Sequence, residues 1–208
     1  MPLITSLKEA EGIAGKLSKP SKMPGYAYGL PAQACITGSR LAKIPGTVCS
    51  SCYALKGRYI FPNVKNAQKK RLESITHPLW VDAICYQLEH YDCRHFRWHD
   101  SGDIQSLEHL DRIVQIAQRL PQINFWLPTR EKAMVSTYTD THLIPRNLVI
   151  RVSGTMIDGH APVKFLHTST VTTKSDQVTC PAPLQDNSCG TCRACWNPAV
   201  SNISYRRH

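Results

Sequence analysis

The order of apolar and polar positions along the chain predicts strands that alternate with helices. The clearest helix spans residues 106–120, where apolar residues recur every three or four positions, Ser106 can cap the first turn and Pro121 stops the last. Residues 95–99 alternate polar and apolar, as a half-buried strand does, whereas 148–152 is apolar enough to be buried on both faces. Further strands are expected at 26–30, 123–127 and 163–167, and further helices at 6–17, 64–76, 78–91 and 130–138.

This order of elements predicts an α/β fold. Strands separated by helices form parallel sheets with crossover connections, so we expect a partial TIM-like barrel or a parallel sheet with crossover helices. Residues 176–208 have no clear periodicity and hold four cysteines, which indicates a cysteine-rich tail. We therefore expect residues 1–175 to form the α/β domain, with a three-cysteine loop between residues 31 and 62, and residues 176–208 to pack on it.

Polar residues and glycines follow the first four expected strands. Sites in parallel α/β folds lie at the carboxyl ends of the strands, so these residues are expected to share one cleft beside the three-cysteine loop. The candidate catalytic residues are Asp100, Asp103 and Arg130. The candidate cofactor-binding residues are Ser101, Gly102, Thr129 and Ser153. Arg130 is the expected anion binder, because a guanidinium group can grip a carboxylate or phosphate with two hydrogen bonds; alternatively it starts a helix and pairs with Glu131 or solvent.

Composition changes the picture mainly through nine cysteines, which is more than core packing explains. Four of them, Cys180, Cys189, Cys192 and Cys195, form a C-terminal group in which three are spaced by two residues and the remote one is followed by a proline. This is the ligand spacing of bacterial ferredoxins and indicates a 4Fe–4S cluster. A four-thiolate zinc site normally uses two separate Cys-x2-Cys pairs, so zinc fits less well. Free or redox-active thiols are the third interpretation.

The other cysteine group, Cys35, Cys49 and Cys52, lies in the long loop after the first expected strand. Three thiolates on a 4Fe–4S cluster leave one iron open, so this loop is a candidate for a second cluster. Two alternatives are that Cys35 is a packing residue and that one of the three serves the C-terminal site. Cys85 on an expected helix and Cys93 before a strand are assigned to packing.

Charge and histidines add less. The formal net charge is +10, from 25 Lys and Arg against 15 Asp and Glu, so a polyanionic partner such as nucleic acid is possible. No recognised nucleic-acid motif supports it, and a solubilising surface explains the charge equally well. His95 and His99 share one strand face with Arg97, which indicates a solvated or hydrogen-bonded face, although His99 at the strand exit is the better candidate for a site.

Several motifs together resemble a phage family named after gene product eighty-eight. They lie at residues 30–39, 46–59, 99–104 and 125–131 and in the final cysteine cluster, so the resemblance covers most of residues 27–205. It implies a phage gene expressed in a bacterial cytoplasm. No apolar run approaches the ~20 residues of a membrane span, and the first residues do not form a charged leader followed by an apolar stretch. We therefore expect a cytoplasmic protein of the infected host, without membrane contact.

The layout also distantly resembles radical S-adenosylmethionine enzymes. In that superfamily a three-cysteine loop after the first strand of a partial barrel holds a 4Fe–4S cluster whose open iron binds S-adenosylmethionine. Cys35, Cys49 and Cys52 are similarly placed, although thirteen residues separate the first two where the superfamily usually has three. Residues 101–103 resemble the glycine-rich motif with an acidic residue that follows its second strand. The C-terminal cysteines would then resemble an auxiliary cluster.

Two classes of function follow from this sequence. The first is an iron–sulfur enzyme that resembles the radical S-adenosylmethionine enzymes and acts on an unknown small molecule or host protein. The second is a non-catalytic iron–sulfur protein, such as an electron carrier, a redox sensor or a host-interaction protein. A zinc-stabilised nucleic-acid binder is a weaker third alternative, supported only by the basic charge.

Overall fold

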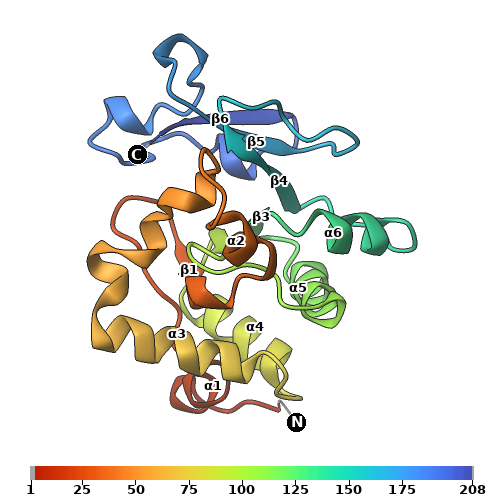
Figure 1. The fold of residues 1–208 in the computed structure, drawn as a ribbon. Coiled ribbons are helices and arrows are strands. Elements are labelled where there is room, and N and C mark those ends of the chain that lie inside the picture. The colour runs from red at the N-terminus through yellow and green to blue at the C-terminus, as the bar shows by residue number, and fades with distance from the viewer. Residues whose placement is uncertain (1–2, 208) are drawn as a thin grey trace.

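The structure, a computed structural model that describes residues 3–207, is built on one sheet of six parallel strands (Figure 1). The strands follow one another across the sheet in chain order, as they do in a TIM-like barrel. The sheet stays open, because β6 does not pair with β1. The strands are β1 (Tyr26–Tyr28), β2 (His95–Trp98), β3 (Asn124–Thr129), β4 (Leu148–Ile157), β5 (Thr168–Thr172) and β6 (Asn202–Arg206). The expected α/β class with a parallel sheet is confirmed.

Helices connect the first four strands. The α-helices are α1 (Leu7–Ala14), α2 (Ile36–Leu41), α3 (Pro62–Ser74), α4 (Trp80–His90), α5 (Leu107–Arg119) and α6 (Lys132–Thr139). Between β1 and β2 the chain forms α2, α3 and α4, whereas α5 and α6 each make one crossover. Within residues 3–207, no α-helix separates β4 from β5 or β5 from β6. The sequence pattern found every crossover helix except α2, which lies inside the long cysteine loop.

The last two strands differ from the prediction. Residues 163–167 were expected to be a strand, but they form turns, and Val163 and Leu166 are 79% and 86% exposed. The strand is instead β5, made largely of threonine, which pairs with β4 from Val152↔Thr168 onward. The sequence also missed β6, which pairs with β5 along its whole length. A strand of the main sheet therefore comes from the segment expected to be the tail; the division into two parts at residue 175 stays a prediction.

The two faces of the sheet have different coverings. Phe96, Trp98 and Phe125 point into the main core, where they meet buried side chains of α4 and α5 such as Trp80, whose ring centroid lies 5.8 Å from that of Trp98. α5 keeps the predicted cap, because the Ser106 hydroxyl accepts a hydrogen bond from the amide of His109. Arg97 of β2 and Trp126 of β3 point to the other face of the sheet, which borders a cavity.

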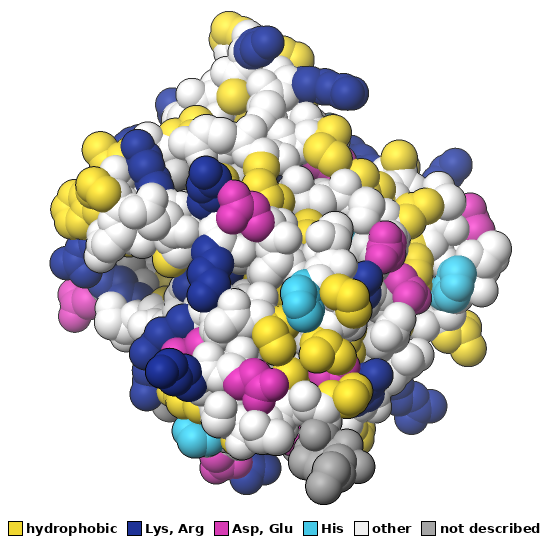
Figure 2. All heavy atoms as spheres, turned by 90° about the horizontal axis from the view of Figure 1, so that it is seen from below, with side chains coloured by type: hydrophobic (Ala, Val, Ile, Leu, Met, Phe, Trp, Pro, Cys, Tyr) yellow, Lys and Arg dark blue, Asp and Glu magenta, His cyan; other side chains and the backbone are white. Residues whose placement is uncertain are grey.

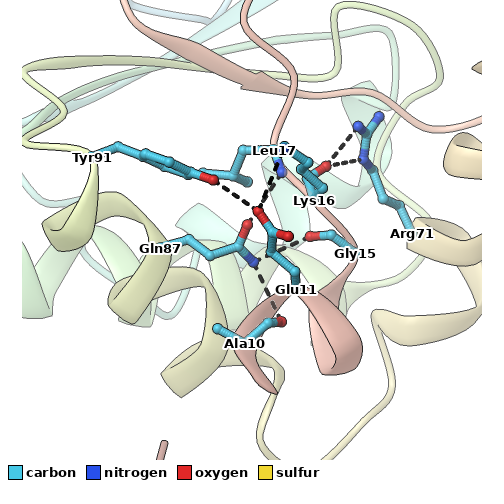
Figure 3. A network of polar contacts seen from close by, with 8 residues as sticks. All are labelled: Ala10, Glu11, Gly15, Lys16, Leu17, Arg71, Gln87 and Tyr91. Atoms are coloured by element: carbon cyan, nitrogen blue, oxygen red, sulfur yellow. Dashed lines mark hydrogen bonds and ion pairs between the residues drawn. The ribbon is translucent and has the colours of Figure 1, made fainter. Parts of the chain in front are cut away.

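A buried polar network ties α1 to α3 and α4 (Figure 3). The Gln87 amide donates to the carbonyl oxygen of Gly15 and accepts from the amide of Leu17. From α3, two guanidinium nitrogens of Arg71 donate to the carbonyl oxygen of Lys16 at 2.9 and 2.7 Å. These bonds satisfy the backbone just after α1, where the chain turns toward β1. They hold the N-terminal segment against the two helices that precede β2.

The surface carries its charges in a mixed arrangement on the face seen in Figure 2. Lys and Arg side chains lie among Asp, Glu and apolar side chains there and do not form one continuous basic surface. This face therefore adds nothing to the nucleic-acid alternative. Among the described residues, no helix combines the length and apolar character needed to cross a membrane.

Candidate functional site

A cavity of about 850 Å³ opens at the carboxyl ends of the strands, beside the three-cysteine loop. It is bordered by that loop, by the exits of β2, β3 and β4, and by β5 and the end of β6. The predicted site residues on its wall are Cys35, Cys49, Cys52, Asp100, Ser101, Gly102, Asp103, Arg130 and Ser153. Thr129 lies one step behind the wall, since its hydroxyl donates to Asp103 at 2.6 Å. The structure thus brings all residues of the expected cleft together.

The three-cysteine loop is fixed over the sheet by side chains as well as by its own turns. Thr37 donates from both its amide and its hydroxyl to the two carboxylate oxygens of Glu131, at 2.8 and 2.7 Å. Tyr59 donates to Oδ2 of Asp100 at 3.1 Å, and the hydroxyl of Tyr53 donates to the carbonyl oxygen of the same residue. These bonds connect the loop to the exits of β2 and β3.

The sulfur atoms of Cys35 and Cys49 converge on Gly38. A methyl group added at Gly38 would lie 3.5 Å from one sulfur and 3.7 Å from the other, and only 2.9 Å from Cβ of Cys35. Burial, together with the charges of Asp103 and Cys52, raises the pKa of Cys35 to about 12. Burial also raises the pKa of Cys49, against the opposing charge of Arg130. The site therefore favours the neutral thiol form of Cys35 and Cys49.

Asp103 organises the exits of β2 and β3. One of its oxygens accepts from Thr129 and from the amide of Ile104, and the other accepts from the amide of Arg130 at 2.8 Å. Burial raises its pKa to about 6, although these hydrogen bonds oppose the shift. Because both carboxylate oxygens are engaged, this side chain is better suited to positioning than to direct proton transfer. Thr129 in turn accepts from the amide of Glu131.

Of the residues just before Asp103, two have structural roles and one has a carboxylate oxygen without a partner. The Ser101 hydroxyl donates to the carbonyl oxygen of Leu30 and accepts from Gln68, so it ties the β2 exit to the β1 exit and to α3. Gly102 has φ +79°, and a Cβ there would lie 2.5 Å from Cβ of Leu30, so only glycine fits. Asp100 differs, because its buried Oδ1 atom has no hydrogen-bond partner among residues 3–207.

His99 belongs to the buried part of the site, and not to a solvated strand face. It is 3% exposed and lines the cavity, and burial lowers its pKa to about 4, so it is neutral at pH 7. Its Nε2 atom is buried without a partner in the described chain. His95, at the other end of β2, packs against Trp196 with ring centroids 5.5 Å apart.

The C-terminal cysteines gather in one place, close to β6 and to Arg97 of β2. Burial raises the pKa of Cys180, Cys189 and Cys195, and the charge of a second cysteine of this group raises each further. The amide of Cys189 donates to the carbonyl oxygen of Lys22, just before β1. Cys195 lies 3.2 Å from the hydroxyl of Tyr205 on β6. All four C-terminal cysteines therefore share one neighbourhood, while Cys85 and Cys93 lie in the apolar core.

Comparison with protein families gives a match over most of the chain. The model of the family described as Gene product 88 covers residues 4–198. The chain belongs to this family. The expected resemblance to the phage gene product family is thereby confirmed, whereas the resemblance to radical S-adenosylmethionine enzymes gains no support. No curated protein and no solved structure matches the chain.

Neither cysteine group of this Gene product 88 family member is arranged around a single metal ion. Across residues 3–207, no three His, Cys, Asp or Glu side chains are placed as ligands of one ion. A 4Fe–4S cluster makes a different demand, because each thiolate binds a separate iron corner of a cube. The three loop cysteines share one neighbourhood, since the charges of Cys49 and Cys52 both act on Cys35.

Sequence reasoning missed several residues of the cavity wall. Arg97, Trp126 and Tyr205 come from the middle of strands, and Tyr53 and Tyr59 come from the loop. The alternation in residues 95–99 was the available signal for Arg97. It predicted a polar face correctly, but it could not show that the loop and the tail would cover that face.

Proposed function

We propose that this protein is an iron–sulfur protein in which Cys35, Cys49 and Cys52 hold a 4Fe–4S cluster with one iron left open. The observation that carries the proposal is the cavity wall, which contains these three cysteines and, within the described residues, no fourth one. An open iron beside an 850 Å³ cavity can accept a small molecule. A cluster of this kind would supply a single electron to a bound substrate.

We further propose that the activity is radical chemistry on S-adenosylmethionine or a related cofactor. The support is the position of the loop, which follows β1 of an open parallel sheet and lies at the strand ends where such folds bind ligands. The chain's own contribution is positioning. Asp103 holds the β2 and β3 exits together, and Arg130 offers a guanidinium group to an anionic part of the substrate. Tyr53 and Tyr59 each donate a hydrogen bond to Asp100 at the β2 exit.

The C-terminal group, Cys180, Cys189, Cys192 and Cys195, is proposed to hold a second cluster. The support is the ferredoxin-like spacing together with the shared neighbourhood of these cysteines. Four cysteines would leave no iron open, so this cluster would carry electrons and not bind substrate. If only this cluster is present, the protein is a non-catalytic electron carrier, redox sensor or host-interaction protein.

The test is anaerobic purification followed by iron and sulfide analysis and electron paramagnetic resonance of the reduced protein. We expect two clusters per chain, and a changed resonance signal on addition of S-adenosylmethionine, with deoxyadenosine as a product. The matched variant Cys49→Ser should lose the changed signal and keep the C-terminal cluster. An unchanged signal without cleavage would eliminate the radical chemistry. Zinc without sulfide would eliminate the iron–sulfur assignment itself.

A further inference from the structure

Two kinds of arginine in this protein have buried donor atoms. Arg71 and Arg151 are nearly or fully inaccessible, and their guanidinium groups donate to backbone carbonyl oxygens. Arg71 donates three hydrogen bonds to Lys16 and Gly29, and Arg151 donates at 2.9–3.0 Å to Ala194, Cys195, Asn197 and Val200. These two side chains have their donors satisfied and hold segments together.

Arg97 and Arg130 are of the second kind, and both residues are half-buried. Both line the cavity, and both have an Nε donor that is buried and without a partner in the part of the chain that the structure describes. Arg97 makes one hydrogen bond to a side chain, from Nη2 to the hydroxyl of Tyr53 at 3.3 Å. The side chain of Arg130 makes no hydrogen bond or ion pair with residues 3–207. A buried donor without a hydrogen-bond partner costs about 1–3 kcal/mol. Two such donors in the wall of one cavity therefore indicate that a ligand binds there.

The charge of the cavity wall selects an anion. Its cationic side chains are Lys43, Arg97, Arg130, Arg206 and Arg207, and its carboxylates are Asp100 and Asp103. Asp103 already accepts three hydrogen bonds from the chain. Within residues 3–207, neither carboxylate forms an ion pair with one of these five cations. A ligand with a carboxylate or phosphate group would meet guanidinium donors whose planar geometry suits such oxyanions.

The remaining wall indicates that the anion is part of an organic molecule. The Arg97 guanidinium lies over the ring of Trp126, 4.5 Å from its centroid, within the distance of a cation–π contact. Tyr53 and Tyr59 form a further aromatic wall, with centroids 5.7 Å apart. The volume of about 850 Å³ far exceeds that of an inorganic ion and is typical of sites for drug-sized ligands. Aromatic walls favour a planar, unsaturated body.

We infer that this cavity binds an organic anion that has a planar body and a carboxylate or phosphate group, and that Arg97 and Arg130 bind this molecule. The inference rests on the proposed function in one respect, namely that this cavity is the reaction site, and it names the class of substrate. The residues that would bind the anion are side chains of the protein itself, so its binding can be measured without catalytic turnover.

The experiment is calorimetric titration of the anaerobically purified full chain with four probes: naphthyl phosphate, naphthoate, neutral naphthamide and inorganic phosphate. We expect one or both naphthyl anions to bind at least tenfold more tightly than naphthamide and than inorganic phosphate. Whichever naphthyl anion binds more tightly identifies the oxyanion as a phosphate or a carboxylate. Equal binding of naphthamide, or equal binding of inorganic phosphate, would overturn the inference.

Variants assign the contacts. Arg97→Gln and Arg130→Gln should each weaken binding of the preferred anion at least tenfold, and Arg97→Lys should restore part of the loss. The matched control is Arg58→Gln. Arg58 is an exposed arginine of the three-cysteine loop and lies outside the cavity wall, so this variant should leave binding unchanged. Normal affinity in both glutamine variants would overturn the inference. If Arg97→Gln does not fold, as judged by thermal unfolding, Arg97→Lys and Arg130→Gln decide the outcome.

Iron and sulfide analysis of the same samples separates the two hypotheses. Anion binding without iron and sulfide would reject the proposed function and leave the anion site standing. Normal clusters without anion binding would reject this inference alone.

Discussion

The Arg151 guanidinium on β4 donates a hydrogen bond of 3.0 Å to the carbonyl oxygen of Cys195, the last cysteine of the chain. Further donors of the same side chain reach the carbonyl oxygens of Ala194, Asn197 and Val200. One fully buried side chain in the middle of the sheet therefore fixes the backbone of the cysteine-rich segment before β6 begins. The position of the C-terminal cysteines depends on the core of the α/β fold as well as on any metal they bind.

Replacing Arg151 with Met is expected to loosen this segment. The variant would leave at least four carbonyl oxygens without their donor, so we expect the free energy of unfolding to fall by about 3 kcal/mol or more. The measurement is urea denaturation followed by tryptophan fluorescence. Arg146→Met, at an exposed position before β4, is the matched control and should change stability by less than about 0.5 kcal/mol. Equal stability of the two variants would contradict the anchoring role.

Replacing Cys192 with Ser is expected to remove one cluster's worth of iron and sulfide from anaerobically purified protein. The reason is that the C-terminal group has four cysteines in one neighbourhood, and a hydroxyl is a poor ligand for iron. Cys85→Ser is the control, because this cysteine is buried in the apolar core of α4 and its loss should leave the iron content unchanged. Full iron and sulfide in the Cys192 variant would show the C-terminal assignment to be wrong.

The sequence predicted the elements whose signals are local. The cap at Ser106 and the apolar stripe after it gave α5 almost to the residue, and the run 148–152 gave most of the buried part of β4. The prediction of a strand at residues 163–167 was wrong, because these residues form turns and Val163 and Leu166 are exposed. The strand that forms instead is rich in threonine and is stabilised by its neighbours β4 and β6. Pairing between distant segments overrode local hydrophobicity there.

The candidate site shows the same division. The polar strand exits could be predicted, because parallel strands end at a common edge and Asp100, Asp103 and Arg130 follow such ends directly. The role of Arg97 could not, since the aromatic surface it lies on, Trp126, is 29 positions away and comes from the next strand. Arg151 likewise sits in an apolar run, and only the fold shows that it meets the cysteine-rich segment.

Replacing Gly38 with Ala is expected to disturb the N-terminal cysteine site. The added methyl group would lie 2.9 Å from Cβ of Cys35, so this side chain or the helix α2 must shift, at a cost of about 1–3 kcal/mol. We expect less iron bound to the loop cysteines and an unchanged C-terminal cluster, as measured by iron analysis and paramagnetic resonance. Gly12→Ala is the control, because nothing lies within 4 Å of the added methyl group. It should stabilise α1 by about 0.5–1 kcal/mol and leave the iron content unchanged. A normal iron content in the Gly38 variant would contradict the proposed cluster site next to Gly38, where the sulfur atoms of Cys35 and Cys49 lie.

The last prediction concerns acid stability and depends on His109. This side chain is 2% exposed between Trp80 and His99, with ring centroids 5.6 and 5.3 Å away, and burial lowers its pKa well below the usual value. In the unfolded chain His109 takes up a proton as the pH falls through about 6.5, whereas the folded protein keeps it neutral. Its contribution to stability is therefore complete above pH 6.5 and is lost on acidification, by up to about 1.4 kcal/mol per pH unit.

The variant His109→Gln isolates this contribution from those of other buried groups. Asp103 acts in the opposite sense, because its raised pKa lets the folded protein hold a proton that the unfolded chain releases between about pH 4 and 6. Both proteins share that effect, so it cancels in the difference between them. Urea denaturation at half-unit steps from pH 7.5 to 5 should show the stability advantage of the wild type over the variant shrinking as the pH falls. A difference that stays constant over this range would mean that His109 titrates alike in the folded and unfolded chains, and its buried neutral state would then be wrong.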